Sequence, residues 1–155
     1  MAGKVAARLR ELGITLPAAN PPAGNYVPTV RTGNLLFVSG QISMVDGKPG
    51  PIGRLGAELS VEDGARAART CGLSLLAQAS AALDGDLDRI VRCVKVTGFV
   101  AATPEFRDHP KVVNGASDLF AEVLGDAGRH ARAAVGMASL PAGVACEVEA
   151  IFEVR

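Results

Sequence analysis

Two stretches of the chain carry hydrophobic residues at steps of three and four, the spacing that gathers side chains on one face of an α-helix. The first begins at Ser60 and Asp63, which resemble a capping box, and ends near Asp84-Gly85. Its apolar face is built of Val61, Ala65, Ala68, Gly72, Leu75, Leu76, Ala79 and Leu83. The second runs from Pro110 to Gly125, with Val112, Val113, Ala116, Leu119, Phe120, Val123 and Leu124 on its apolar face. Both patterns predict helices that pack closely on a sheet.

Runs of apolar and β-forming residues predict four strands, at 34–43, 91–101, 130–139 and 144–154. A short helix is predicted at 4–12, with Val5, Leu9 and Leu12 on one side, and a loop rich in Pro and Gly follows it. The resulting order is strand, helix, strand, helix, strand, strand. We therefore predict an α+β fold in which two helices pack on one face of a sheet of four to six strands.

The last two predicted strands flank residues 140–143, a connection containing Pro and Gly that suits a hairpin. A symmetric turn places Gly136 opposite Glu147 and puts Arg132 on the face that carries the glutamates. The apolar face of the first of these strands would then hold Ala131, Ala133, Val135 and Met137. Because small residues leave space beside the charges, this mixed face is a candidate site.

The same register separates Arg132 from Glu147 by four residues, roughly 13 Å along the strands. Two groups so far apart cannot grip one small ligand. Either the register is wrong, or the site is completed at a contact between subunits. We favour the second interpretation.

Each candidate residue also has a purely structural interpretation. A strand-borne Arg132 beside glutamates such as Glu147 is most often part of a solvated ion pair. Ser39-Gly40 would be a strand end, Asn114 an exposed helix residue and Tyr26 a packing residue of a loop. Pattern alone favours these interpretations.

Composition narrows the class of protein. The 155 residues suit one domain, 1–155, in which residues 1–20 are an N-terminal helix and loop extension. The formal net charge is zero and no basic tract stands out, so nucleic acid is not an expected partner.

No apolar run is long enough to span a membrane and no secretory signal is present, so we expect a cytoplasmic protein. The three cysteines show no metal-ligand spacing, and we expect buried thiols and no metal.

Several sequence segments together resemble the RidA (YjgF) family of reactive-intermediate deaminases, formerly grouped with L-PSP endoribonucleases. They are Asn25-Tyr26, Gly33-Asn34, LFVSGQI at 36–42, Asn114 within KVVNGASDLF, and RAAVGMASLPAGVACEVEA at 132–150. The last segment is the most specific, because it is similar to the family's pattern of Arg, Leu-Pro and Glu-x-Glu. The resemblance covers nearly the whole chain from Tyr26 onward.

This resemblance implies a chorismate-mutase-like fold, assembled as a homotrimer with sites between subunits. It implies hydrolysis of enamine and imine intermediates such as 2-aminoacrylate to 2-oxo acids and ammonia, without a cofactor or metal. Arg132 would hold the substrate carboxylate, and Glu147 would orient water and relay a proton. Ser39 and the Gly40 N–H would hold polar atoms, while Tyr26 and Asn114 would shape the pocket.

The sequence departs from the family pattern at Ala134, where a Cys is common, so no thiol assists there; Cys146 would point to the opposite face. The N-terminal helix and residues 103–111 look like those of a longer branch of the family. Retained residues therefore support a retained site and leave the substrate open.

Three functions remain. The leading one is an imine or enamine deaminase, the alternative is a non-catalytic module that binds a small carboxylate metabolite, and a less favoured one is an endoribonuclease or translation inhibitor. The chain has two histidines and no basic excess, which disfavours the ribonuclease. Turnover, rather than binding, separates the first two.

Overall fold

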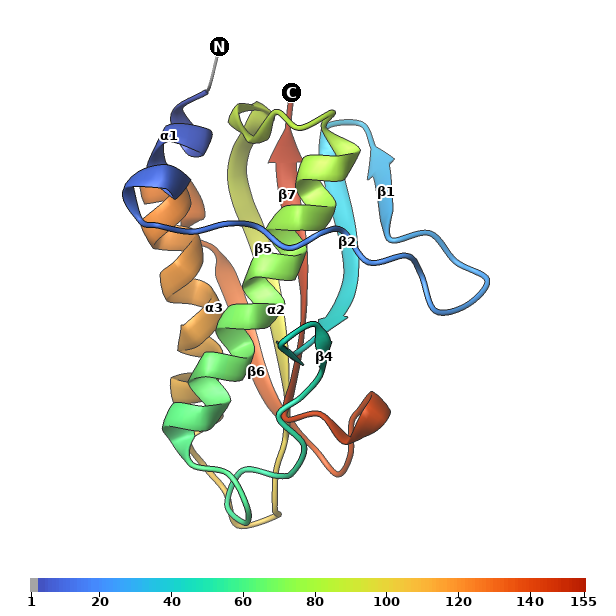
Figure 1. Ribbon diagram of the computed structural model, residues 1–155, viewed down its shortest axis with the longest axis vertical. Helices are drawn as coiled ribbons and strands as arrows, with labels where there is room; N and C mark the ends of the chain where they lie inside the picture. The colour runs from blue at the N-terminus through green and yellow to red at the C-terminus, as the bar shows by residue number, and fades with distance from the viewer. Residues whose placement is uncertain (1–2) are drawn as a thin grey trace.

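The computed structural model describes residues 3–155 as a mixed α+β structure with helices on one side of a sheet (Figure 1). Its helices are α1 (Lys4–Glu11), α2 (Val61–Ala82), α3 (His109–Leu124) and the short 3-10 turns η1 (Leu87–Arg89), η2 (Gly125–Gly128) and η3 (Pro141–Gly143). Its strands are β1 (Thr29–Thr32), β2 (Leu35–Ile42), β3 (Met44–Val45), β4 (Lys48–Pro49), β5 (Ile90–Ala101), β6 (Ala131–Met137) and β7 (Cys146–Val154). The predicted α+β class is confirmed, and β1 and the small β3–β4 hairpin are additions to it.

Five strands form the main sheet in the order β1-β2-β7-β5-β6. All neighbours are antiparallel except β5 and β6, which are parallel. Helices α2 and α3 lie side by side over one face of this sheet, as predicted (Figure 1). The opposite face carries none of the described helices, and we refer to it below as the open face.

The predicted hairpin between the last two strands is wrong. Helix α3 returns the chain to the start of β5, so β6 runs parallel to β5 along the edge of the sheet. The segment after β6 then carries the chain past β5, and β7 inserts between β2 and β5. Gly136 therefore lies opposite Val100, and Glu147 lies opposite Phe99. In this position β7 is hydrogen-bonded on both edges, to β2 and to β5.

The predicted faces of β6 are also wrong. Arg132 lies opposite Val96, which is completely buried beneath the helices, so Arg132 is on the helix-covered face. Val135 and Glu147 both lie opposite Phe99, and these three residues share the open face. Strand β6 exposes its larger apolar residues because it is an edge strand with no helix over its outer side.

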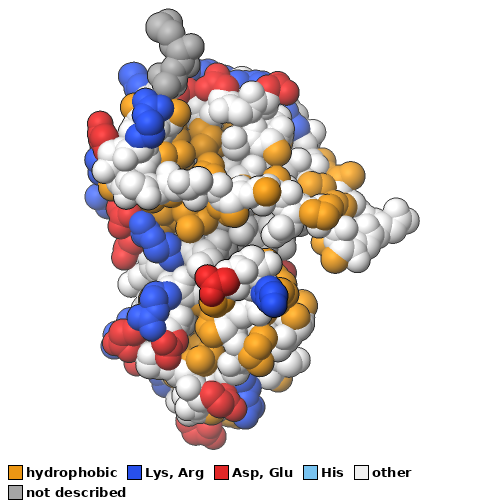
Figure 2. Space-filling view, viewed as in Figure 1, with side chains coloured by type: hydrophobic (Ala, Val, Ile, Leu, Met, Phe, Trp, Pro, Cys, Tyr) orange, Lys and Arg blue, Asp and Glu red, His pale blue; other side chains and the backbone are white. Residues whose placement is uncertain are grey.

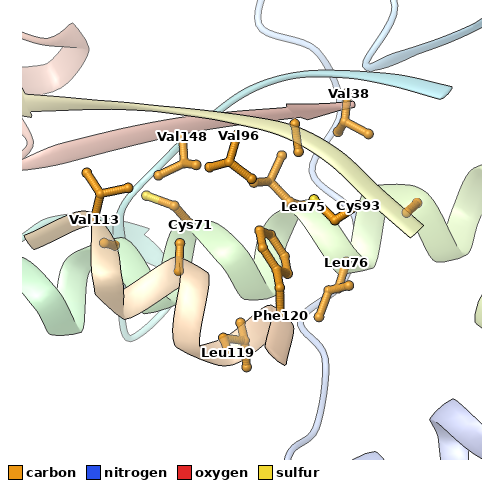
Figure 3. Packing of buried hydrophobic residues seen from close by; sticks show 14 of the residues in the cluster. Val38, Cys71, Leu75, Leu76, Cys93, Val96, Val113, Leu119, Phe120 and Val148 are labelled. Carbon is orange, nitrogen blue, oxygen red and sulfur yellow. The ribbon is translucent and has the colours of Figure 1, made fainter. Parts of the chain in front are cut away.

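The core fills the layer between the sheet and the helices (Figure 3). Phe120 of α3 packs edge-on against Phe152 of β7, with ring centroids 5.8 Å apart. Close approach of the two helices depends on Gly115, because a Cβ atom there would overlap the backbone carbonyl of Ala65. Ser60 and Asp63 form the predicted capping box at the start of α2. All three cysteines are buried, as expected.

The N-terminal segment connects the helix layer with the far edge of the sheet. Leu9 of α1 is buried against the core, and the chain then crosses in front of α2 towards β2 (Figure 1). Residues 20–28 project from the body of the molecule next to β1 and β2 (Figure 2). Residues 3–20 thus comprise helix α1 and the first part of this crossing segment, and residues 1–2 of the predicted extension lie outside the described part. Within residues 3–155 no helix has both the length and the apolar character needed to cross a bilayer.

Candidate functional site

Glu147 lies on the open face of β7, beside an irregularity in the neighbouring strand β2. The ladder between β2 and β7 shifts register between Val38 and Gln41, and Ser39 and Gly40 occupy the irregular stretch. The Glu147 carboxylate lies over Gly40, in the space that a Cβ atom at that position would fill. Glycine is therefore required at position 40 if Glu147 is to keep this orientation.

The protonation of Glu147 is shifted towards the neutral acid. Burial of the half-covered side chain raises the pKa of Glu147, and the negative charge of nearby Glu149 raises it further. A carboxyl group whose pKa is displaced towards neutrality can both accept and return a proton. Glu147 is therefore a candidate general acid–base group.

A cavity of about 330 Å³ lies next to Glu147. Four of the predicted site residues line it together: Tyr26, Ser39, Gly40 and Glu147. Its remaining walls come from the projecting segment, from β2 to β4, from α2 and from the turn after β6, and include Pro21, Pro22, Ile42, Met44, Gln78 and Pro141. Tyr26 is half exposed, and its hydroxyl accepts a hydrogen bond from the Ala23 N–H at 3.2 Å. The cavity is thus mostly apolar with a few polar groups, which is typical of a small-molecule site.

Arg132 and Asn114, the other two predicted residues, form a second cluster at the edge of the helix layer. Nη1 of Arg132 donates to Asn114 Oδ1 at 2.8 Å and to Ser117 Oγ at 3.1 Å, and Nη2 donates to the Pro110 carbonyl at 3.3 Å. No hydrogen bond within residues 3–155 uses Nε–H or the second Nη2–H. The guanidinium is therefore oriented by α3 and keeps two donors for a carboxylate.

Ser117 and His130 belong to this cluster, although the sequence did not single them out. His130 Nδ1 donates to the Gly128 carbonyl at 2.7 Å, which leaves Nε2 to accept a hydrogen bond from the Ser117 hydroxyl at 2.9 Å. Burial lowers the pKa of His130, and the positive charge of Arg132 lowers it further against the opposing effect of the Gly128 hydrogen bond. The spacing could have revealed both residues, since Ser117 follows Asn114 by one helical turn and His130 precedes Arg132 by two strand positions.

The two clusters do not meet within one chain. Arg132 pairs with position 96 of β5 and Glu147 with position 99, a difference of three residues or roughly 10 Å along the strand. They also lie on opposite faces of the sheet. The sequence-based expectation that Arg132 shares the glutamate face is therefore wrong, and so is the register from which their separation of four residues was derived. The two residues are nonetheless apart in the structure.

The arrangement favours recognition of a small organic acid over metal chemistry. One cluster offers a carboxyl group with a raised pKa beside a cavity, and the other offers an oriented guanidinium. Within residues 3–155, no three His, Cys, Asp or Glu side chains are grouped as metal ligands. Ala134 faces the core, and Cys146 is buried on the opposite face from Glu147, so neither cluster includes a thiol. Fold and clusters together define a small α+β protein with a candidate small-molecule site.

Comparison with known proteins gives the family. Residues 6–154 match the family described as "YjgF/chorismate mutase-like, putative endoribonuclease". The chain is 51% identical over 154 residues to Protein TCP17 of Trypanosoma cruzi, covering 99% of this chain and 96% of that protein. It is also 51% identical to protein Atu1372 of Agrobacterium tumefaciens, whose crystal structure aligns with a TM-score of 0.91 over 99% of this chain and 95% of that one. The protein belongs to the YjgF/chorismate mutase-like family, as the resemblance implied.

A more distant structure carries a ligand. The crystal structure of E. coli TdcF with bound serine aligns with a TM-score of 0.61 at 26% identity, over 88% of this chain and 93% of that chain. The extension before β1 is shared with the relatives that are 51% identical, since the matches cover 99% of this chain.

Proposed function

We propose that this protein hydrolyses small 2-imino acids to 2-oxo acids and ammonia. The observation that carries the proposal is the pairing of two complementary groups: a carboxyl group with a raised pKa at a cavity, and a guanidinium fixed by three acceptors with two donors left over. A 2-imino acid has two matching features. The guanidinium would bind its carboxylate, and the carboxyl group would act at the imine carbon next to it.

The chemistry requires only water and proton transfer. 2-Aminoacrylate takes up a proton at its terminal carbon and releases one from its nitrogen, which gives 2-iminopropanoate. Water then adds to the C=N carbon, giving a carbinolamine, which expels ammonia and leaves pyruvate. Arg132 would hold the carboxylate through two parallel hydrogen bonds, and Glu147 would take a proton from the attacking water and return it to the departing nitrogen.

We propose further that the site is completed between chains of a homotrimer, so that Arg132 of one copy approaches Glu147 of another. The separation of the two clusters within one chain supports this arrangement. So does the open face, where Val30, Phe37, Val135 and Met137 are each at least one-third exposed. Apolar side chains spread over a sheet face favour burial against another copy.

The serine seen in TdcF supports the ligand class, because serine carries a carboxylate beside an amino-bearing carbon. A non-catalytic module that binds small carboxylates would use the same clusters, so it stays as the second candidate. The family description also names an endoribonuclease. The described clusters disfavour that activity, since they offer one guanidinium and a histidine whose pKa is lowered by burial.

The proposal is tested by clearance of 2-aminoacrylate. A serine dehydratase generates the intermediate, and pyruvate formation is followed with and without the protein. We expect acceleration that falls at least about 100-fold in Glu147→Gln, the usual scale for loss of a general acid–base group. Arg132→Ala should weaken binding of pyruvate, and Arg132→Lys should rescue it only in part, because an ammonium lacks the planar fork.

Glu153→Gln is the matched control, since it makes the same change on the same face of β7 outside the cavity. It should retain full activity. Binding of pyruvate without any acceleration of imine hydrolysis would replace the deaminase by the binding module. Cleavage of RNA that depends on Arg132 would favour the endoribonuclease instead.

A further inference from the structure

Two buried glutamines line the cavity beside Glu147. Gln41 of β2 is 9% exposed and Gln78 of α2 is 3% exposed, and both contribute to the walls of the same 330 Å³ space. Buried polar side chains are normally satisfied by partners. The partners of these two amide groups therefore indicate what the cavity can bind.

Both amide nitrogens are used by the chain itself. Gln78 Nε2 donates to the Asn20 carbonyl at 2.7 Å, which ties the projecting segment to α2. Gln41 Nε2 donates to the Ser39 carbonyl at 3.1 Å. Because a carbonyl oxygen only accepts, each nitrogen must face the backbone and each Oε1 must take the other position. The amide orientations are thus fixed by chemistry.

Neither Oε1 accepts a hydrogen bond within residues 3–155, although both side chains are more than nine-tenths buried. The one inaccessible side-chain N or O atom without a partner in that range is the Ser43 hydroxyl. The two amide oxygens therefore remain accessible, and both belong to residues that line the cavity. With Glu147, the residues lining the cavity include three side chains whose oxygens are predominantly acceptors.

The space exceeds the needs of the smallest substrate. At about 30 Å³ for a water molecule, 330 Å³ corresponds to roughly ten waters, whereas 2-aminoacrylate has only six non-hydrogen atoms. A ligand that displaces water from an unpaired acceptor without replacing its hydrogen bond loses affinity. Acceptors in the remaining space thus discriminate against side chains that lack a donor.

We propose that Gln41 and Gln78 form a side-chain subsite of the proposed deaminase, and that it selects substrates whose side chain ends in an N–H or O–H donor. The inference rests on the proposed function for the position of the carboxylate and the imine. Carboxylate-ended side chains are disfavoured, because they would bring acceptors and negative charge towards Glu147. The apolar walls of Pro21, Pro22 and Met44 accommodate the methylene groups between the two ends.

The test compares amino acids of one shape that differ only at the side-chain end. Asparagine, leucine and aspartate are nearly isosteric, and their dissociation constants are measured by calorimetry with the full chain, with serine as the reference ligand. Asparagine should bind about tenfold more tightly than leucine, the scale of one added hydrogen bond, and aspartate should bind most weakly. In Gln78→Met the advantage of asparagine over leucine should shrink to about twofold or less.

Ser74→Ala is the matched control. Ser74 is buried on α2 one turn before Gln78 but does not line this cavity, so the ranking of ligands should be unchanged. Equal affinities of the wild-type protein for asparagine and leucine, with serine bound, would overturn the subsite and leave the deaminase proposal intact. Absence of binding by serine, pyruvate and all three probes would overturn both. The wild-type comparison decides the matter even if Gln78→Met does not fold.

Discussion

At the scale of single residues, the site depends on a glutamate whose surroundings oppose its ionised form. Glu147 is half-buried beside another glutamate, and both circumstances oppose its ionisation. The stability of the protein must reflect this, because a group whose pKa is raised by folding holds its proton more tightly in the folded than in the unfolded state. The contribution of protonated Glu147 to folding stability is complete below the usual pKa of a glutamate. It is lost as the pH rises through the raised pKa of Glu147 in the folded protein.

Glu147→Gln should therefore stabilise the protein at neutral pH relative to the wild type. The gain should be small, about 1 kcal/mol or less, since the carboxyl group is only partly shielded from solvent. It should disappear below the usual pKa range of glutamate. Urea unfolding at a series of pH values measures the difference, and a variant that is less stable than the wild type at neutral pH would contradict burial as the main cause of the shift.

At the scale of secondary-structure elements, helix α1 is capped by a residue from a distant part of the chain. Its N-cap is Gly3, which has no side chain to accept the first N–H groups. The Asp88 carboxylate accepts them instead, from Lys4 at 2.7 Å and Val5 at 2.8 Å. These backbone hydrogen bonds lower the pKa of Asp88, so its contribution to stability is present above the usual carboxyl pKa of aspartate and is lost as the pH falls through the lowered value.

Asp88→Ala should loosen α1 by about 0.5–2 kcal/mol, the range for loss of a helix cap. Amide hydrogen exchange in Lys4–Glu11 should accelerate while exchange in β5 and β7 stays unchanged. Asp118→Ala is the control, because that aspartate is exposed on helix α3, where alanine is well tolerated. Unchanged exchange in α1 after the Asp88 substitution would contradict a capping role.

The secondary-structure elements also show what the sequence could predict and what it could not. Periodicity and the Ser60–Asp63 box locate α2 correctly, because both signals are local. The insertion of β7 between β2 and β5 is decided by contacts between residues far apart in the chain, such as Phe37 with Ile151. A hairpin connection and a crossing connection look alike in the Leu-Pro-Ala-Gly segment, so the register and the face of Arg132 were mistaken. The capping of α1 by a residue 84 positions away was equally hidden.

At the scale of the whole molecule, the two clusters occupy different faces and cannot serve one ligand alone. All six predicted site residues nevertheless fall into these clusters, with Tyr26, Ser39, Gly40 and Glu147 in one and Asn114 and Arg132 in the other. Sequence resemblance identified the residues, and only the sheet order divides them. Assembly is the natural means of reuniting them.

Mixed assemblies test this division. Chains carrying Arg132→Ala and chains carrying Glu147→Gln should each be inactive, yet unfolding and refolding them together should restore about a quarter of the wild-type activity. That fraction follows from random association. A site is intact only where a chain that keeps Arg132 lies next to a chain that keeps Glu147, in the order that forms the site. Light scattering checks that the mixture has the trimer mass. Lack of recovery in a well-formed trimer would place both residues of each site in one chain, contrary to the proposal.

The contact between Gly40 and the Glu147 carboxylate also bears on how such a protein can diverge. A side chain at position 40 requires the Glu147 carboxylate to move aside, and such a movement changes the place of the acid at the cavity. The two positions are thus not independent in evolution. Replacement of the glycine and loss of the glutamate are therefore expected to accompany one another in a lineage that abandons the chemistry.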